Sequence, residues 1–411
     1  MGSLIPDTEA RLRPSWYLLG PAFVAAIAYV DPGNVAANVS AGAQYGFLLV
    51  WVIVVANVMA GLVQFLSAKL GLVTGRSLPE AVADHTRTGT RIAYWLQAEL
   101  VAMATDLAEV VGGAIALHLL FDLPLLVGGV ITGAASLLLL AIQNWRSQRM
   151  FERVISGLLL VIAIGFLTSL FVEPPSAGDV AAGLLPRFEG SESVLLAAAM
   201  LGATVMPHAV YLHSGLARDR HGHPEAGRQR RWLLKVTRLD VGLAMLVAGA
   251  VNLAMLLVAA TNLQGRDNTD SIEGAHAAVR DTLGPTVALL FAVGLLASGL
   301  ASTSVGAYAG AMIMQGLLRR SYPLLLRRLV TLIPALAILA IGVDPSRALV
   351  LSQVVLSFGI PFALIPLVRL TSNRSLMGED TNHRVTTALG WSVAALISVL
   401  NVVLIYLTVK G

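Results

Sequence analysis

The chain has 411 residues, of which 56% are hydrophobic and 13% are charged. Soluble domains carry about twice that share of charged residues, and the apolar residues here recur in runs close to or above the ~20 residues that cross a bilayer. The composition therefore excludes a string of soluble domains and predicts one all-α integral membrane protein. Because the chain has no cysteine, thiolate metal sites, disulfides and thiol catalysis are also excluded.

Eleven apolar runs are predicted to be transmembrane helices. They form a single domain over 15–408, after a mostly polar tail at 1–14 that is expected to be cytoplasmic. The first run contains an aspartate and is not followed by a small-residue cleavage pattern, so we expect a retained helix and not a signal peptide. The predicted spans are 15–44, 47–72, 91–118, 125–143, 152–172, 194–217, 235–261, 286–315, 324–343, 347–369 and 386–408.

The lysines and arginines follow the positive-inside rule. If the N-terminus lies in the cytoplasm, cytoplasmic segments hold all of the 28 basic residues except Arg187, Arg266, Arg280, Arg347 and Lys410. An odd number of spans then places the C-terminus outside a cell membrane that the chain crosses many times. Because this bias accounts for the net charge of +4, no nucleic-acid partner is expected.

The first span is interrupted at 31–34, which read Asp-Pro-Gly-Asn. Proline removes a backbone donor and glycine weakens a helix, and an aspartate at membrane depth is costly without a partner. We therefore expect an unwound stretch whose freed carbonyl groups line a cavity. The alternative is a simple proline kink in which Asp31 is hydrogen-bonded to a neighbouring helix.

The sixth span is interrupted in a similar way, with Gly202 followed by Met-Pro-His at 206–208. Interrupted helices at corresponding places in two halves of a membrane protein indicate a transporter binding site. Five spans in each half invert the second half, which predicts an inverted repeat of 15–172 and 194–369, with 386–408 as an additional helix. The two halves share no visible sequence identity, so the repeat rests on this pattern.

The residues at the two interruptions favour a cation. Asp31 repels anions, and Asn34 adds a carbonyl oxygen; across the cavity, Met206 offers a thioether and Ala203 a backbone oxygen. Oxygen ligands alone suit magnesium or calcium, whereas a thioether favours a softer transition metal. A methionine in a membrane helix is more often a packing residue, but its place directly before Pro207 favours a ligand.

The third span carries three acids, Glu99, Asp106 and Glu109, at spacings that put them on one face of a helix. Such a stripe predicts a polar pathway or, alternatively, a structural network between helices. His208 follows Met206 by two residues and is of a type that titrates near neutral pH. Arg327 and Arg328 begin the ninth span on the cytoplasmic side, and the simplest interpretation is that they snorkel to the interface.

The two interruptions together resemble the signature pair of the Nramp family of proton-coupled divalent metal transporters. The resemblance covers nearly the whole chain, including Glu99–Glu109 and Gln353–Pro361. One departure is Ala209, which stands where many members have asparagine and lies outside the ligand set. The resemblance implies a LeuT-like fold with a 5+5 inverted repeat and broken helices 1 and 6. The metal ligands that it implies are Asp31, Asn34, the Ala203 carbonyl and Met206, joined in some conformations by the Ala28 carbonyl and Gln353.

The resemblance also implies a function. It predicts import of Mn²⁺, and of Fe²⁺ and Cd²⁺, that is coupled to protons and proceeds by alternating access. The chain is expected to act as a monomer and to need no prosthetic group. Proton movement would involve Asp31 and Asp106, surrounded by Glu99, Glu109, His208 and Arg328.

The sequence disfavours three other functions. An enzyme is not expected, because the chain has no phosphate-binding loop, catalytic triad or zinc-protease helix. A sodium-coupled amino-acid symporter of the same fold would need a glycine-rich carboxylate cradle where Asp31 stands. A metal channel would not need the broken-helix repeat, which favours alternating access. The sequence does not separate manganese from iron, whose ligand preferences overlap.

Overall fold

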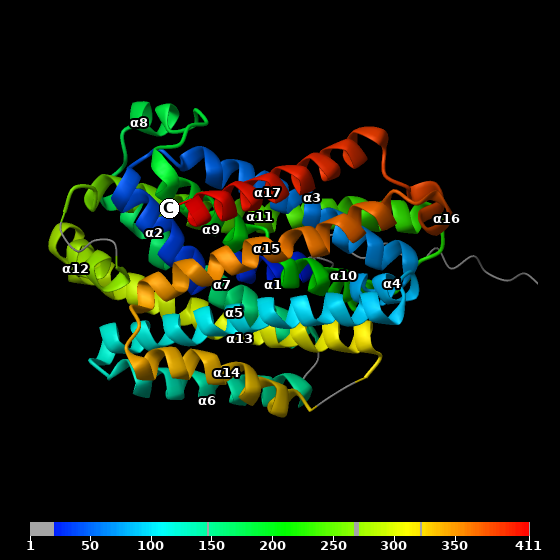
Figure 1. Cartoon of the computed structure of the whole chain (residues 1–411), viewed down its shortest axis with the longest axis horizontal. Coiled ribbons are helices and arrows are strands. Elements are labelled where there is room, and N and C mark those ends of the chain that lie inside the picture. Colours follow the sequence, from blue (N-terminus) through cyan, green and yellow to red (C-terminus); the bar gives the residue numbers. More distant parts are fainter. Residues whose placement is uncertain (1–19, 146–147, 267–270, 321–322, 411) are drawn as a thin grey trace, which may run out of the picture.

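A computed structural model describes residues 20–145, 148–266, 271–320 and 323–410, in which every regular element is a helix (Figure 1). The expected all-α class is confirmed. The predicted tail at 1–14 lies outside the described residues. The helices are α1 (Pro21–Ile27), η2 (Ala28–Val30), α2 (Pro32–Tyr45), α3 (Val50–Thr74), α4 (Leu78–Asp84), α5 (Thr88–Phe121), α6 (Leu125–Trp145), α7 (Gln148–Val172), α8 (Ala177–Ala182), α9 (Gly190–Thr204), α10 (Pro207–His221), α11 (Arg228–Asn262), α12 (Ile272–Leu283), α13 (Pro285–Leu318), α14 (Leu324–Ile341), α15 (Pro345–Thr371), α16 (Arg374–Met377), η3 (Gly378–Asp380) and α17 (Arg384–Lys410).

Each of the eleven predicted spans coincides with a long helix or with a pair of helices separated by a break. The pairs are α1 with α2, joined through η2, and α9 with α10. Among the described residues, eight segments are long and apolar enough to cross a membrane, with Gly190–His221 counted as one. The first span, which is broken, contributes the shorter apolar stretch Pro21–Val30, and α6 contributes the shorter apolar stretch Leu125–Leu138.

The connections hold short helices that the apolar pattern did not predict. Figure 1 shows α4 and α16 at one end of the bundle and α8 and α12 at the other. The connections predicted to be cytoplasmic therefore gather at one end, and the two long connections predicted to lie outside gather at the opposite end. The positive-inside pattern requires these two sets of connections to lie at opposite ends of the bundle, as they do here.

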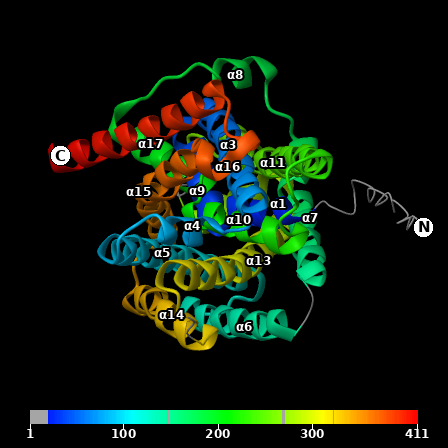
Figure 2. The same ribbon diagram turned by 90° about the vertical axis from the view of Figure 1, so that its right-hand side faces the viewer.

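Close packing around the breaks depends on glycine. A side chain at Gly112 of α5 would overlap the Pro32 ring, and one at Gly202 of α9 would overlap the Gln353 carbonyl of α15. Small residues let membrane helices approach each other closely. As a result α5 and α15 press directly against the two broken helices, while α14 and α6 lie beyond α5 and α13 on the far side of the bundle (Figures 1 and 2).

Candidate metal-binding site

The first break is a helix end followed at once by a new helix start. After the single 3-10 turn of η2, Asp31 has an extended backbone and is the N-cap of α2, where its side chain accepts a 2.7 Å hydrogen bond from the Asn34 N–H. A carboxylate at a helix N-terminus is favourable because it pairs with free N–H groups. Pro32 occupies the first helical position, where its missing donor costs nothing. The predicted unwound stretch is confirmed.

The second break repeats this design. Helix α9 ends at Thr204, Val205 leaves the helical conformation, and Met206 is an extended N-cap before Pro207 opens α10. Met206 offers no hydrogen-bonding cap to its helix. Its side chain is fully buried, so the thioether lies at the break without serving the backbone.

Asn34 joins the two breaks. Its amide nitrogen donates to Asp31 Oδ1 and to the Ala203 carbonyl oxygen, both at 2.9 Å. From α15, the Gln353 amide nitrogen reaches Asp31 Oδ2 at 3.4 Å. Side chains at the start of α2 and on α15 are thereby brought together with a backbone carbonyl of α9, and all four residues are buried. Ala28, the remaining residue of the predicted ligand set, is buried in η2.

Two oxygens at this meeting point have no hydrogen-bond donor among the described residues: Asn34 Oδ1 and Gln353 Oε1. Buried carbonyl oxygens without a donor are uncommon because they have lost water without replacement. Both belong to amides whose nitrogen atoms contact Asp31. The fully buried thioether of Met206 follows Ala203 by three residues. One carboxylate and two amide oxygens, with a thioether from the second break, fit a divalent cation that accepts both hard and soft ligands.

The described residues contain no group of three or more His, Cys, Asp or Glu that could hold a metal ion. A site of the usual histidine and carboxylate type is therefore absent from that part of the chain. The donor set around Asp31 carries a single negative charge.

The acidic stripe of α5 faces α14. Asp106 and Glu109 both pair with Arg328, the latter at 3.5 Å, and Glu99 pairs with Arg327 at 3.0 Å. Arg328 is 2% exposed and also donates to Ser136 of α6 at 3.1 Å. The prediction that the Arg328 side chain snorkels to the membrane interface is therefore wrong. Both remaining interpretations, a structural network and a polar pathway, are compatible with this arrangement.

His208 lies between the site and the stripe. Its Nδ1 is 3.4 Å from the Thr105 hydroxyl of α5, one residue before Asp106. The histidine is 3% exposed. It is therefore placed beside the acidic stripe while belonging to the same break as Met206.

One polar chain near the site was not predicted. His213 Nδ1 lies 2.6 Å from Gln64 Oε1, and the Gln64 amide nitrogen donates to the Tyr29 hydroxyl. This chain links α10 to η2 through α3. Its sequence signals were single polar residues within apolar spans, Gln64 and His213, which do not show which residue each contacts.

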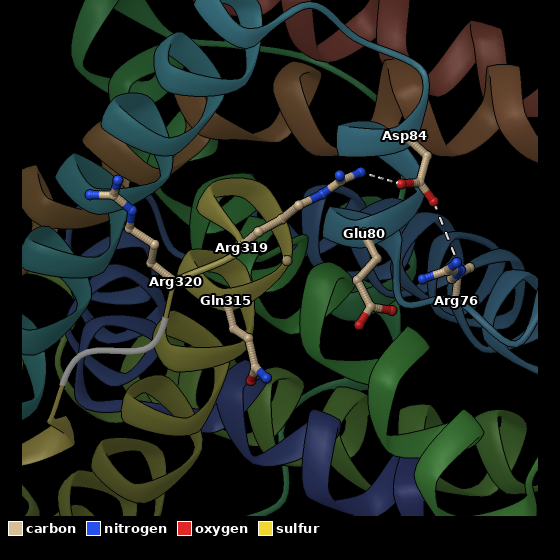
Figure 3. A pocket seen from close by; sticks show the side chains of 7 residues that line it. Arg76, Glu80, Asp84, Gln315, Arg319 and Arg320 are labelled. Atoms are coloured by element: carbon tan, nitrogen blue, oxygen red, sulfur yellow. Dashed lines mark hydrogen bonds and ion pairs between the residues drawn. The ribbon is translucent and has the colours of Figure 1, made fainter.

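A separate open cavity of about 430 Å³ lies at the end of the bundle that holds α4 (Figure 3). Asp84 there accepts a 2.7 Å hydrogen bond from Arg319 and lies 3.8 Å from Arg76, while the Arg320 side chain points away from this pair in Figure 3. The lining residues are Arg76, Glu80, Asp84, Gln315, Gly316, Arg319 and Arg320. None of them belongs to the donor set around Asp31.

A family model described as natural resistance-associated macrophage protein-like (Nramp) matches residues 22–407. The chain belongs to the Nramp family. Over 411 residues it is 72% identical to the divalent metal cation transporter MntH of Mycobacterium tuberculosis strain CDC 1551, covering 100% of this chain and 96% of that protein. The family expected from the paired interruptions is thereby confirmed.

Solved structures confirm the architecture. The manganese transporter of Eremococcus coleocola, in complex with an aromatic bis-isothiourea substituted compound, has a TM-score of 0.84 at 29% identity and covers 97% of this chain and 88% of that one. Mhp1, a nucleobase-cation-symport-1 family transporter, has a TM-score of 0.61 at 18% identity and covers 94% and 90%. The second similarity shows the fold alone. Together they bear out the expected LeuT-like Nramp fold.

Proposed function

We propose that this chain imports divalent transition metal ions, Mn²⁺ and with it Fe²⁺ and Cd²⁺, across the cell membrane by alternating access and with coupled proton entry. The observation that carries the proposal is the junction of the two breaks, where Asn34 bridges Asp31 and Ala203 and two amide oxygens lack donors. The names of the relatives, divalent metal cation transporter and manganese transporter, support the same cargo.

The metal would be held by Asp31, Asn34, the Ala203 carbonyl and Met206, with the Ala28 carbonyl and Gln353 joining in some conformations. Asp31 supplies the only negative charge. The thioether of Met206 offers calcium and magnesium almost nothing in exchange for lost water, since these ions prefer oxygen ligands. Selection against the two abundant hard cations therefore falls to Met206.

Metal binding requires Asn34 to move. In the structure the Asn34 amide nitrogen donates a 2.9 Å hydrogen bond to the Ala203 carbonyl oxygen. The Ala203 oxygen and Asn34 Oδ1 therefore cannot both face one ion until the Asn34 amide turns. That turn breaks the direct link between α2 and α9. A metal ion that takes both oxygens replaces the link, so binding changes how the two broken helices are held together.

The proton is proposed to leave Asp31 when metal binds and to move inward by way of Asp106, with Glu99, Glu109 and His208 in the surrounding network. Arg328 is one cation shared by Asp106 and Glu109. One of the two acids can therefore carry a proton while the other still pairs with the guanidinium. An inward-negative potential favours entry of both cations by about 2.3 kcal/mol per charge per 100 mV.

The proposed topology has a cytoplasmic tail at 1–14, repeats at 15–172 and 194–369, and helix 386–408 ending outside. The chain would act as a monomer in the lipid bilayer, with metal ions and protons as its partners and no prosthetic group or enzymatic step.

The test is metal uptake into proteoliposomes with an internal pH dye. We expect Mn²⁺ uptake that competes with Fe²⁺ and Cd²⁺, resists excess Ca²⁺ and Mg²⁺, and acidifies the lumen. Amino-acid uptake driven by sodium would point to the symporter alternative. Flux far faster than that of a carrier and independent of a conformational cycle would point to a channel.

A further inference from the structure

We propose that Asn252 and Ser298 are positioning residues that hold the first break open and thereby keep the Asp31 carboxylate aimed into the metal site. The inference rests on the proposed function, because it assigns these two residues a role in metal affinity. Neither belongs to a broken helix: Asn252 lies on α11 and Ser298 on α13.

The argument begins with the backbone donors that Asp31 takes for itself. In a continuous helix the N–H groups of Gly33 and Asn34 would donate to the carbonyls four residues earlier, those of Tyr29 and Val30. Here the Asn34 N–H bonds the Asp31 carboxylate instead, and the extended backbone of Asp31 interrupts the helical ladder between Tyr29 and Gly33. Two carbonyl oxygens at membrane depth are consequently left without their helical partners, and each needs a donor from elsewhere.

Those donors come from the two neighbouring helices. The Asn252 amide nitrogen donates to the Tyr29 carbonyl at 2.7 Å, and the Ser298 hydroxyl donates to the Val30 carbonyl at 2.5 Å. Both side chains are 1% exposed. Asn252 is itself held in place, because its Oδ1 accepts a 2.8 Å hydrogen bond from Asn38 of α2. Asn252 thus contacts the chain on both sides of Asp31.

Removing either donor leaves the Tyr29 or Val30 carbonyl without a hydrogen bond. A buried carbonyl without a partner is unfavourable, and the N–H groups of Gly33 and Asn34, at the start of α2, can act as replacement donors. If those groups return to Tyr29 or Val30, the Asp31 carboxylate loses its cap and its direction. The expected consequence is weaker metal binding in a protein that still folds.

The chain offers a matched comparison on one helix. Ser298→Ala removes the hydroxyl that reaches Val30. Ser302→Ala removes a hydroxyl one turn later, which bonds only the carbonyls of Ser298 and Gly299 within α13. Ser298→Thr keeps the hydroxyl. A second pair is Asn252→Leu, which loses the bond to Tyr29, and Asn38→Leu, which leaves that bond in place.

The experiment measures the Mn²⁺ dissociation constant by calorimetry on full-length purified protein, with thermal stability recorded alongside. Ser298→Ala and Asn252→Leu are expected to weaken Mn²⁺ binding by about tenfold, whereas Ser302→Ala and Ser298→Thr stay within about twofold of the parent. The Mn²⁺ dissociation constant of Asn38→Leu is expected to lie between those of these two groups. Equal affinities for Ser298→Ala and Ser302→Ala, or for Asn252→Leu and Asn38→Leu, would overturn the inference.

Hydrogen exchange of the peptide around 30–38, read without metal, gives a second measurement that does not depend on the cargo. Exchange should be faster in Ser298→Ala and Asn252→Leu and unchanged in Ser302→Ala. If the parent binds no Mn²⁺, the proposed function fails while this comparison still decides whether the two residues hold the break. Unchanged exchange in all variants contradicts the positioning role even if Mn²⁺ binds.

Discussion

Asn34 and Ala203 are 169 positions apart in the chain, and the Asn34 amide nitrogen donates a 2.9 Å hydrogen bond to the Ala203 carbonyl oxygen. This bond joins the two broken helices directly across the proposed site. It also occupies an oxygen that the proposed metal needs. The two breaks are therefore linked by a contact that metal binding must replace, and the predictions below follow from the groups around it.

Met206→Ala tests selectivity. The substitution leaves room for a water molecule, which suits every candidate ion, and removes the only soft donor. Mn²⁺ should still be carried, the flux of Cd²⁺ should fall most, and Ca²⁺ or Mg²⁺ should begin to compete with Mn²⁺ for transport. Metal flux through this variant and the parent in matched proteoliposomes checks the expectation. An unchanged preference for Cd²⁺ over Ca²⁺ would make Met206 a packing residue.

Asp106→Asn tests the proton route. Asp106 pairs with Arg328 on the acidic face of α5 and is not among the groups that hydrogen-bond Asp31 in the described residues. The neutral amide should leave Mn²⁺ affinity within a few-fold of the parent and slow proton entry. The measurement is lumenal pH recorded together with Mn²⁺ uptake. Proton entry at the parental rate would remove Asp106 from the route.

Arg328→Gln tests whether the stripe is also structural. Removing one partner of a buried ion pair leaves an uncompensated charge and typically costs about 3–5 kcal/mol. Arg319→Gln is the matched control, because Arg319 pairs with Asp84 (Figure 3) but its side chain is 61% exposed, and exposed pairs contribute about 0–1 kcal/mol. We expect a large fall in the melting temperature for Arg328→Gln and almost none for Arg319→Gln. Similar melting temperatures would contradict the buried network.

The sequence was sufficient for the parts of this molecule that leave a local signal. Apolar runs gave the eleven spans, and proline and glycine beside Asp31 and Met206 gave both breaks. Spacing alone also put Glu99, Asp106 and Glu109 on one face, the face that meets Arg327 and Arg328.

Tertiary contacts of single polar residues left no such signal. Asn252 and Ser298 lie in long, mostly apolar helices, and their role depends on which carbonyl lies opposite after packing. The same holds for the chain from His213 through Gln64 to Tyr29. The direction of the Asn34 amide could not be predicted either, because an amide can donate from its nitrogen or accept at its oxygen, and only the groups that lie opposite after packing select between them.

The central claim is that Asp31 supplies the charge that binds the metal. Asp31→Asn keeps the size of the side chain and one oxygen but removes that charge, and its amide brings a donor to a site that needs acceptors. The most direct measurement is Mn²⁺ uptake by Asp31→Asn and the parent in matched proteoliposomes, with thermal stability confirming that both are folded. The account predicts near-complete loss of uptake in a folded protein. Substantial uptake by Asp31→Asn would contradict it.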